Sequence, residues 1–225
     1  MRAYPIALHT RLYLDRNVVR AAELRTCFEL NAITGFSTIV FYSTPILPNS
    51  ELDRFIEGEL KELAFLYGLR LIIDADYEEI PTFNQIIKTA NRHTPDHINV
   101  VANSDIAFPS ASVVALQGML TNRDDLAIIL SRWDMQDEGG PVFFDRADSQ
   151  DVWAWKGTCK GLTSIDFTLG KAGCDNRFAW ELQRMGYMVV NKGKSIMTLH
   201  FHRSNVRHYS PNDPVPPPYL TIQPE

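Results

Sequence analysis

Short apolar runs rich in β-branched and aromatic residues alternate with helical patterns along the first half of this 225-residue sequence. The runs predict strands, because they are short and bounded by polar or proline-containing segments. The segments between them repeat apolar residues every three or four positions, which predicts helices. The predicted strands are 6–9, 37–42, 69–74 and 97–102, and the predicted helices are 17–31, 50–67 and 81–91.

This alternation constrains the fold more than any other feature of the sequence. Strands that alternate with helices form a parallel sheet with right-handed crossovers and helices on both faces. Beyond residue 108 the pattern changes to a helix at 110–120, a strand at 126–132, and then short aromatic strands with long loops. We therefore expect a single α/β domain with a Rossmann-like, mostly parallel sheet, a more irregular second half, and a Pro-rich tail at 209–225.

Charge and cysteine content exclude several classes of protein. The 22 Lys and Arg against 27 Asp and Glu give a net charge of −5, so nucleic acid has no general attraction to the chain, although a local basic groove is not excluded. Cys27, Cys159 and Cys174 are too far apart for a disulfide framework, and we expect buried thiols. We also expect a cytoplasmic protein, because neither a signal-peptide pattern nor an apolar run of roughly 18 residues is found.

Polar residues at the ends of the predicted strands are the first candidates for function. In sheets of this kind, ligands bind outside the carboxyl ends of the strands. Asp74 and Asp76 follow one strand, and Asn103, Ser104 and Asp105 follow the next. A carboxylate at the solvent-facing end of an apolar strand can hold Mg²⁺ or Mn²⁺. The ion would then link the carboxylate to a diphosphate. The same residues are typical of a turn or a helix cap, and spacing alone favours that alternative.

A second candidate is a polar loop that leads into an aromatic strand. Asp148, Gln150 and Asp151 can hydrogen-bond an acceptor, and Trp153 and Trp155 share one face of the strand that follows. Two indoles on one face can form a stacking platform for a sugar or a base. The alternative is a loop that enters a strand whose tryptophans belong to the core.

Asp175 is a third candidate, because it stands at a predicted helix start. A carboxylate in this position can accept a proton from an attacking hydroxyl group. The alternative is plain capping of the helix N-terminus.

Two histidines near the end of the chain form the fourth candidate. His200 and His202 share one face of a predicted strand, so both can approach one ion, or one can bind metal while the other meets a phosphate. Arg203 and Arg207 can add positive charge for a diphosphate. Ordinary surface histidines and a solvated cationic face are the alternatives.

Taken in this order, the four candidates make the sequence resemble the GT-A-type glycosyltransferases. An acid at a strand end, an aromatic acceptor loop, an acid at a later helix start and a late histidine follow one another in that family. The resemblance covers about residues 5–209. It rests on the stretches 103–106, 148–153, 173–177 and 200–202, which are also similar to uncharacterised glycosyltransferase-like proteins of bacteria and of large viruses or phages.

The resemblance implies a divalent metal, Mn²⁺ or Mg²⁺, on Asp105. Asn103 stands where the family has the first acid of its DxD motif, so this chain has an NSD variant with one charge fewer. The departure implies weaker metal binding, ligation through water, or a third ligand from His200 or His202.

The resemblance also implies how the chain divides. Residues 1–208 would form the catalytic domain, with a nucleotide-sugar-binding half at 1–108 and an acceptor-binding half at 109–208. The implied partner is a nucleoside-diphosphate sugar, with a UDP-sugar favoured. Its implied contacts are Thr10, Arg11, Asp74, Asp76, Asn103, Ser104 and Asp105.

The function expected from the sequence is therefore metal-assisted glycosyl transfer, inverting and with Asp175 as the base. The acceptor would be a glycan, a small molecule or a hydroxylated DNA base. A nucleotidyltransferase is the alternative enzyme class, although no glycine-rich phosphate loop supports it. Asn103 motivates a non-catalytic alternative, a carbohydrate- or nucleic-acid-binding module on the same fold.

Overall fold

The computed structural model describes residues 4–77, 80–159, 166–204, 206 and 213–225. The strands are β1 (Ile6–Arg11), β2 (Thr38–Tyr42), β3 (Arg70–Asp74), β4 (Ile98–Ala102), β5 (Ile106–Ala107), β6 (Leu126–Leu130), β7 (Trp133–Asp134), β8 (Val142–Phe143), β9 (Val152–Lys156), β10 (Met188–Asn191) and β11 (Leu199–His200). The helices are α1 (Val18–Ile33), α2 (Glu51–Phe55), the π-helical turn η1 (Ile56–Leu60), α3 (Lys61–Leu66), α4 (Phe83–His93), α5 (Ser110–Leu120) and α6 (Cys174–Arg184).

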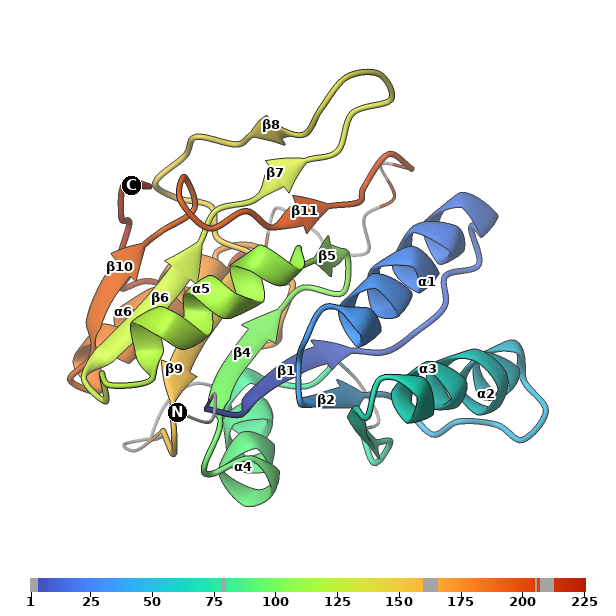
Figure 1. The fold of residues 1–225 in the computed structure, drawn as a ribbon. Helices are drawn as coiled ribbons and strands as arrows, with labels where there is room; N and C mark the ends of the chain where they lie inside the picture. Colours follow the sequence, from blue (N-terminus) through green and yellow to red (C-terminus); the bar gives the residue numbers. More distant parts are fainter. Residues whose placement is uncertain (1–3, 78–79, 160–165, 205, 207–212) are drawn as a thin grey trace.

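A seven-stranded sheet in the order β10-β6-β9-β4-β1-β2-β3 runs through the centre of the molecule (Figure 1). Neighbouring strands are parallel except at β9, which lies antiparallel between β4 and β6. A second sheet, β5-β11-β7-β8, joins short strands from the second half of the chain with the segment after β4. The predicted α/β class, with a mostly parallel sheet and a more irregular second half, is confirmed.

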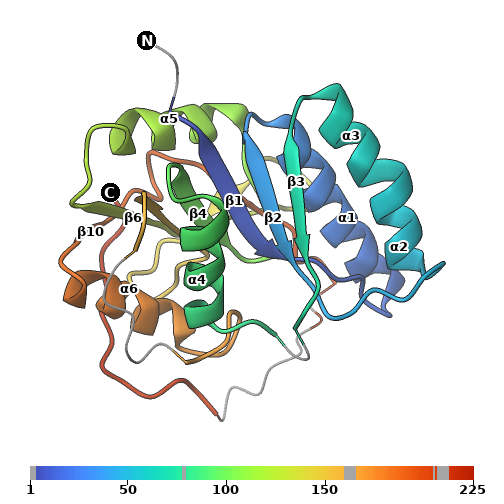
Figure 2. The same ribbon diagram turned by 90° about the horizontal axis from the view of Figure 1, so that it is seen from below.

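Helices cover both faces of the large sheet, as the view from below shows (Figure 2). On one face, α1, α5 and the continuous segment α2-η1-α3 pack on side chains such as Leu8 and Val100. On the other face, α4 and α6 pack on side chains such as Val40 and Val101. Each strand therefore sends alternate side chains into two separate cores, as parallel sheets buried on both faces do.

Local capping fixes where two of the helices begin. The Asn17 side chain accepts hydrogen bonds from the backbone N–H groups of Val19 and Arg20, which starts α1. Thr82 and Gln85 form a reciprocal capping box at the start of α4. The first of these caps places Arg20 in the first turn of α1.

The structure corrects the prediction for Trp153 and Trp155. Their indoles share one face of β9, as the spacing indicated, but both side chains are 0% exposed. They pack edge-on against Phe178 of α6, and Trp153 also meets Phe83 of α4. The prediction that the two indoles form a stacking platform for an acceptor was therefore wrong. The alternative, that the tryptophans belong to the core, is right. The reason is topological: β9 lies inside the sheet, so its side chains face two helices and no solvent.

The described part of the C-terminal segment runs back over the second half of the chain. Val215 is buried in the core under α6. The N–H groups of Leu220 and Ile222 donate to the carbonyls of Asn176 and Ala147. In the part of the chain that the structure describes, no helix has the length and apolarity needed to cross a membrane.

One polar side chain lies deep inside the sheet. His9 of β1 is 0% exposed, and its ring nitrogens lie 2.8 Å from the Tyr42 hydroxyl and 3.0 Å from Asn99 Oδ1. Burial lowers the pKa of His9 to about 4, because a charged imidazole cannot recover its hydration there. The folded protein therefore holds His9 neutral.

We predict that His9 makes the protein sensitive to mild acid. Between pH 6.5 and about 4, the unfolded chain protonates this imidazole while the folded chain does not, so stability falls as the pH is lowered. The loss should reach about 1.4 kcal/mol per pH unit and total on the order of 3 kcal/mol. Urea unfolding at a series of pH values should show a shallower slope for His9→Gln than for the wild type. Equal slopes would contradict the assignment.

Candidate functional site

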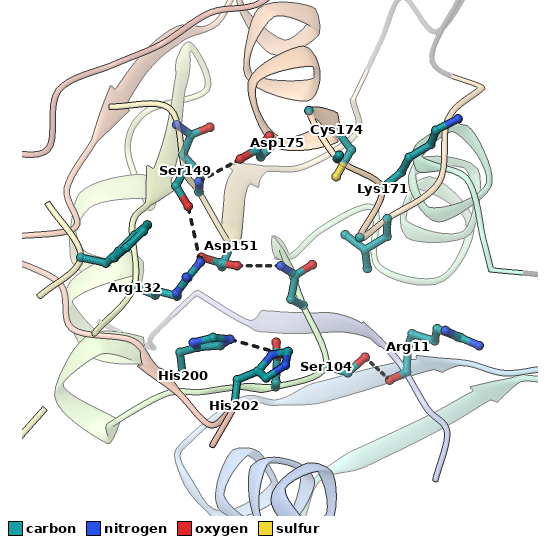
Figure 3. A pocket seen from close by; sticks show the side chains of 18 of the residues that line it. Arg11, Ser104, Arg132, Ser149, Asp151, Lys171, Cys174, Asp175, His200 and His202 are labelled. Carbon is teal, nitrogen blue, oxygen red and sulfur yellow. Dashed lines mark hydrogen bonds and ion pairs between the residues drawn. The ribbon is translucent and has the colours of Figure 1, made fainter. Parts of the chain in front are cut away.

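A cavity of about 480 Å³ opens at the carboxyl ends of β1 and β4. One wall carries Arg11, Asn103 and Asp105 from the first half of the chain. The other wall carries side chains from the loop before β9 and from the start of α6, among them Asp175 (Figure 3). This is the place at which α/β sheets bind their ligands. The strand ends singled out in the sequence thus line the cavity together with the later acid.

Asp105 is the centre of the first wall. It is only 8% exposed, and a single oxygen, Oδ2, meets three cationic or titratable groups. Arg20 donates to it at 2.6 Å, and His200 Nε2 and His202 Nδ1 each lie 3.3 Å away. Arg20 also donates to the Phe201 carbonyl at 2.8 Å, which ties α1 to the segment between the two histidines.

These contacts determine the charges in the cluster. Burial alone would raise the pKa of Asp105, but hydrogen bonds from His200 and His202, with the charge of Arg20, hold it well below its usual value. Burial alone would lower the pKa of His200, but Asp105 and Asp134 raise it to about 9. Asp105 is thus ionised and His200 protonated at neutral pH.

Asp134 of β7 is a site residue that the sequence reasoning missed. Its Oδ1 lies 2.7 Å from His200 Nδ1, on the side of the ring opposite Asp105. A carboxylate in this position orients a metal-binding imidazole and raises its basicity. No local pattern could reveal it, because β7 and β11 are 66 residues apart in the sequence and pair only in the folded sheet.

The cluster has donor atoms that fit a divalent cation. One oxygen of Asp105 and one nitrogen each of His200 and His202 lie within 4.8 Å of one another. Nε2 of His202 is buried without a hydrogen-bond partner among the described residues, as expected of an atom reserved for a ligand. Mg²⁺ prefers oxygen ligands alone, so two imidazoles with one carboxylate fit a transition-metal ion better than Mg²⁺. Binding would displace the proton from the His200 nitrogen that faces Asp105.

Asn103 bonds to a residue on the opposite wall of the cavity. Its side-chain amide donates to Asp151 Oδ1 at 2.8 Å, and its backbone N–H donates to the Asp151 carbonyl. Asp151 in turn forms an ion pair with Arg132 at 3.1 Å. Asn103 therefore joins the end of β4 to the loop before β9, which connects the two walls of the cavity.

Asp175 stands in the second wall, in the first turn of α6. Gly173 precedes it with φ of 76°, a conformation that favours glycine, and turns the chain into the helix. Burial raises the pKa of Asp175 to about 6, although hydrogen bonds from the backbone of Asn176 and Gln150 oppose the shift. A carboxylate with this pKa is a suitable proton acceptor near neutral pH.

The remaining residues predicted on the acceptor loop have different environments. Asp148 lies at the exposed rim and pairs with Arg146 at 2.7 Å. Gln150 is buried, and its side-chain amide donates to the Ala147 carbonyl and to Asn176 Oδ1, so it holds the loop in shape. Both residues line the cavity with Asp151.

Phe144 is an aromatic side chain of the second wall, and the sequence reasoning missed it. It lines the cavity, half-buried, with the guanidinium groups of Arg132 and Arg146 4.4 Å and 5.6 Å from its ring centre.

The residues predicted to contact the nucleotide sugar separate into two groups. Arg11 lines the cavity with its guanidinium 4.4 Å from the Tyr13 ring, and Ser104 lies beside it, donating to the Arg11 carbonyl. Thr10 is buried, and as described it does not line the cavity. Asp74 and Asp76, at the edge of the sheet, are likewise not part of the cavity lining as described.

The two predicted diphosphate residues lie outside this arrangement. Arg203 is exposed, pairs with Asp137, and is not among the described residues that line the cavity. Arg207 lies outside the residues that the structure describes.

Comparisons with known proteins bear on the fold. No protein-family model and no curated protein matches the sequence. Among solved structures, mannosyltransferase PcManGT from Pyrobaculum calidifontis, in complex with GDP-Man and Mn²⁺, matches with a TM-score of 0.54 and 13% identity. The match covers 88% of this chain and 57% of the mannosyltransferase, so the chain spans little more than half of that protein.

HddC from Yersinia pseudotuberculosis matches more weakly, with a TM-score of 0.41 and 12% identity over 68% of this chain and 76% of its own. At identities this low, only the fold is comparable. The chain has a GT-A-like fold.

We predict that Asp134 controls metal affinity through His200. Asp134→Asn should weaken Mn²⁺ binding by roughly 10- to 100-fold, because the imidazole loses its orienting carboxylate. Titration of the protein with Mn²⁺, followed by electron paramagnetic resonance of the free ion, measures this directly. Asp125→Asn, which removes an exposed carboxylate before β6, is the matched control. Equal affinity in the wild type and the Asp134 variant would refute the assignment.

Proposed function

We propose that this protein transfers a sugar from a nucleoside-diphosphate sugar to an acceptor hydroxyl group, with a divalent metal. The observation that carries the proposal is the composition of one cavity. A cation-binding cluster on Asp105 lines one wall, and an acid with a raised pKa, Asp175, lines the other. Glycosyl transfer needs both, because a diphosphate leaves while a hydroxyl group loses its proton.

The donor would lie across the ends of β1 and β4, in the half formed by residues 1–108. Arg11 and Tyr13 offer a stacked cation and ring for the nucleoside end of the donor. Asp105, His200 and His202 would hold the metal, and this donor set fits a transition-metal ion such as Mn²⁺ better than Mg²⁺. When bound, the metal offsets the negative charge that builds on the departing diphosphate.

The acceptor would enter from the half formed by residues 109–208. Asp175 takes the proton of its hydroxyl group, and the freed oxygen forms the new bond to the anomeric carbon. The bond from that carbon to the diphosphate oxygen breaks, and its electrons leave with the diphosphate. We place the attacking oxygen on the face of the anomeric carbon opposite the diphosphate, so this single displacement inverts the configuration of the sugar.

A glycan or a small polyhydroxylated molecule is the acceptor that we propose. The second wall offers Phe144 as a stacking surface and Asp148, Ser149 and Asp151 as polar contacts. A hydroxylated DNA base is less well supported, because the chain carries a net charge of −5 and the buried tryptophans cannot stack on a base.

A panel of UDP- and GDP-sugars tests the proposal, with and without Mn²⁺. Release of nucleoside diphosphate that depends on Mn²⁺ is the expected result. Pyrophosphate release from a nucleoside triphosphate and a sugar phosphate would instead identify a nucleotidyltransferase. If calorimetry showed no nucleotide binding, the result would instead support the non-catalytic binding module.

We predict an acid limb in the pH profile of transfer that belongs to Asp175. The base must be ionised, so below its pKa of about 6 the rate should fall about tenfold per pH unit, and above it the rate should level off. Asp175→Asn should lower kcat by roughly 10²- to 10⁴-fold and remove the limb. Both are measured at saturating Mn²⁺ so that metal binding does not contribute.

The variant Asp166→Asn, on a described residue outside the cavity lining, is the control and should keep the wild-type profile. Survival of the acid limb in Asp175→Asn would remove Asp175 from the mechanism.

We also predict a separate role for Phe144. Phe144→Ala should raise the KM for the acceptor several-fold and leave hydrolysis of the donor by water unchanged, because the ring lines the wall at which we place the acceptor and packs there against Arg132 and Arg146. Trp155→Phe, a change in the core, is the comparison and should lower stability without a selective effect on acceptor KM. If Phe144→Ala reduced transfer to the acceptor and hydrolysis of the donor by the same factor, this role would be contradicted.

A further inference from the structure

Strand β3 forms one edge of the seven-stranded sheet, and its outer side has no partner among the described residues. The sheet order ends at β3, whose only neighbour there is β2. Unlike the fully buried strand β2, β3 has an exposed first residue and partly exposed residues after it. An apolar strand with a free edge is a template for pairing with another strand.

The pattern of backbone hydrogen bonds shows which groups face outward. Arg70 N–H donates to the Ser37 carbonyl, and Ser43 N–H donates to the Asp74 carbonyl. Backbone groups alternate sides along a strand, so Arg70, Ile72 and Asp74 face β2. The N–H and C=O groups of Leu71 and Ile73 therefore face outward, and no described residue bonds to them.

We propose that β3 pairs with β3 of a second copy of this chain, antiparallel and symmetric about Ile72. In this register Leu71 faces Ile73 of the second copy, so each outward N–H meets an outward C=O. Arg70 then faces Asp74 of the second copy, and Asp74 faces its Arg70. A strand whose ends carry opposite charges is complementary to itself only in this antiparallel arrangement.

The side chains at both ends of β3 suit this pairing. Arg70, Ile72 and Asp74 lie on the sheet face covered by α4, where Arg70 reaches the His93 carbonyl at 3.4 Å. Asp74 Oδ2 accepts hydrogen bonds from Tyr77 and Thr89, while no described residue donates to its Oδ1. The charge of Asp74 therefore has no cationic partner within the described chain.

A second observation comes from the end of α3, which precedes β3 directly. Phe65, Leu66 and Tyr67 are 86%, 64% and 59% exposed, a run of large apolar side chains in solvent. They lie beside the Arg70 end of the edge strand. A two-fold axis through Ile72 would set them next to the Asp74 end of the second copy, where they would lose contact with water.

The pairing leaves the candidate site open and is independent of the proposed function. The cavity lies at the carboxyl ends of β1 and β4, and β3 is separated from β1 by β2. Because the two copies would run antiparallel, their cavities would open toward opposite ends of one continuous sheet.

Sedimentation of the purified chain over a range of concentrations tests the proposal. The wild type should form dimers that dissociate on dilution. Arg70→Glu alone and Asp74→Lys alone should each weaken dimers by roughly tenfold or more, because like charges then face each other twice across the axis. Circular dichroism and thermal melting establish that each variant is folded. A wild type that stays monomeric, or a dimer unaffected by Arg70→Glu, would overturn the proposal.

Mixing the two variants gives the sharper result. In a mixed dimer, the introduced glutamate faces the introduced lysine, and the native Asp74 faces the native Arg70. The mixture should therefore recover dimers that neither variant forms alone, and no other contact surface predicts this. Recovery of no dimers from two folded variants would count against the register.

Hydrogen exchange of the wild type provides a test that needs no substitution. The amides of Leu71 and Ile73 should be protected at high concentration and exchange rapidly on dilution. The amides of Arg70 and Ile72, which face β2, should stay protected at both concentrations. Protection of Leu71 and Ile73 that does not change with concentration would exclude pairing at this edge.

Discussion

The ion pair between Arg20 and Asp105 is the contact on which the candidate site depends. Both side chains are almost completely buried, and a buried charge is tolerated only when it is paired and hydrogen-bonded. Arg20 also holds the Phe201 carbonyl, while His200 and His202 approach the same oxygen of Asp105. The carboxylate of Asp105, which follows β4, therefore contacts both the first turn of α1 and the segment at β11.

The surroundings of position 103 favour the asparagine found there over a carboxylate. A carboxylate at position 103 would lie beside the carboxylate of Asp151, which is already paired with Arg132. Asparagine instead donates a hydrogen bond to Asp151 and links the two walls of the cavity. His200 and His202 offer nitrogen atoms that, together with Asp105, fit a divalent cation, and Asp134 lies against the ring of His200.

The reversed strand β9 connects the core to the second wall of the cavity. Because it lies between β4 and β6, its tryptophans fill the core under α4 and α6, and its polar leading residues reach the cavity. The same insertion sets Asp151 next to Asn103 and brings the start of α6, with Asp175, across from Asp105. Asp175, whose pKa is raised, thus lines the same cavity as Asp105 and the two histidines because of one strand's position in the sheet.

The sequence by itself determined the elements of the first half and the strand ends that carry Asn103 and Asp105, because periodicity and turn chemistry act between neighbouring residues. It also indicated Asp175 and the histidine pair, whose spacing along the chain is local. It could not determine that Trp153 and Trp155 are buried, that Asp74 lies outside the cavity, or that Arg20, Asp134 and Phe144 belong to the site. Those outcomes depend on strand order and on contacts between residues far apart in the chain, which only the tertiary structure decides.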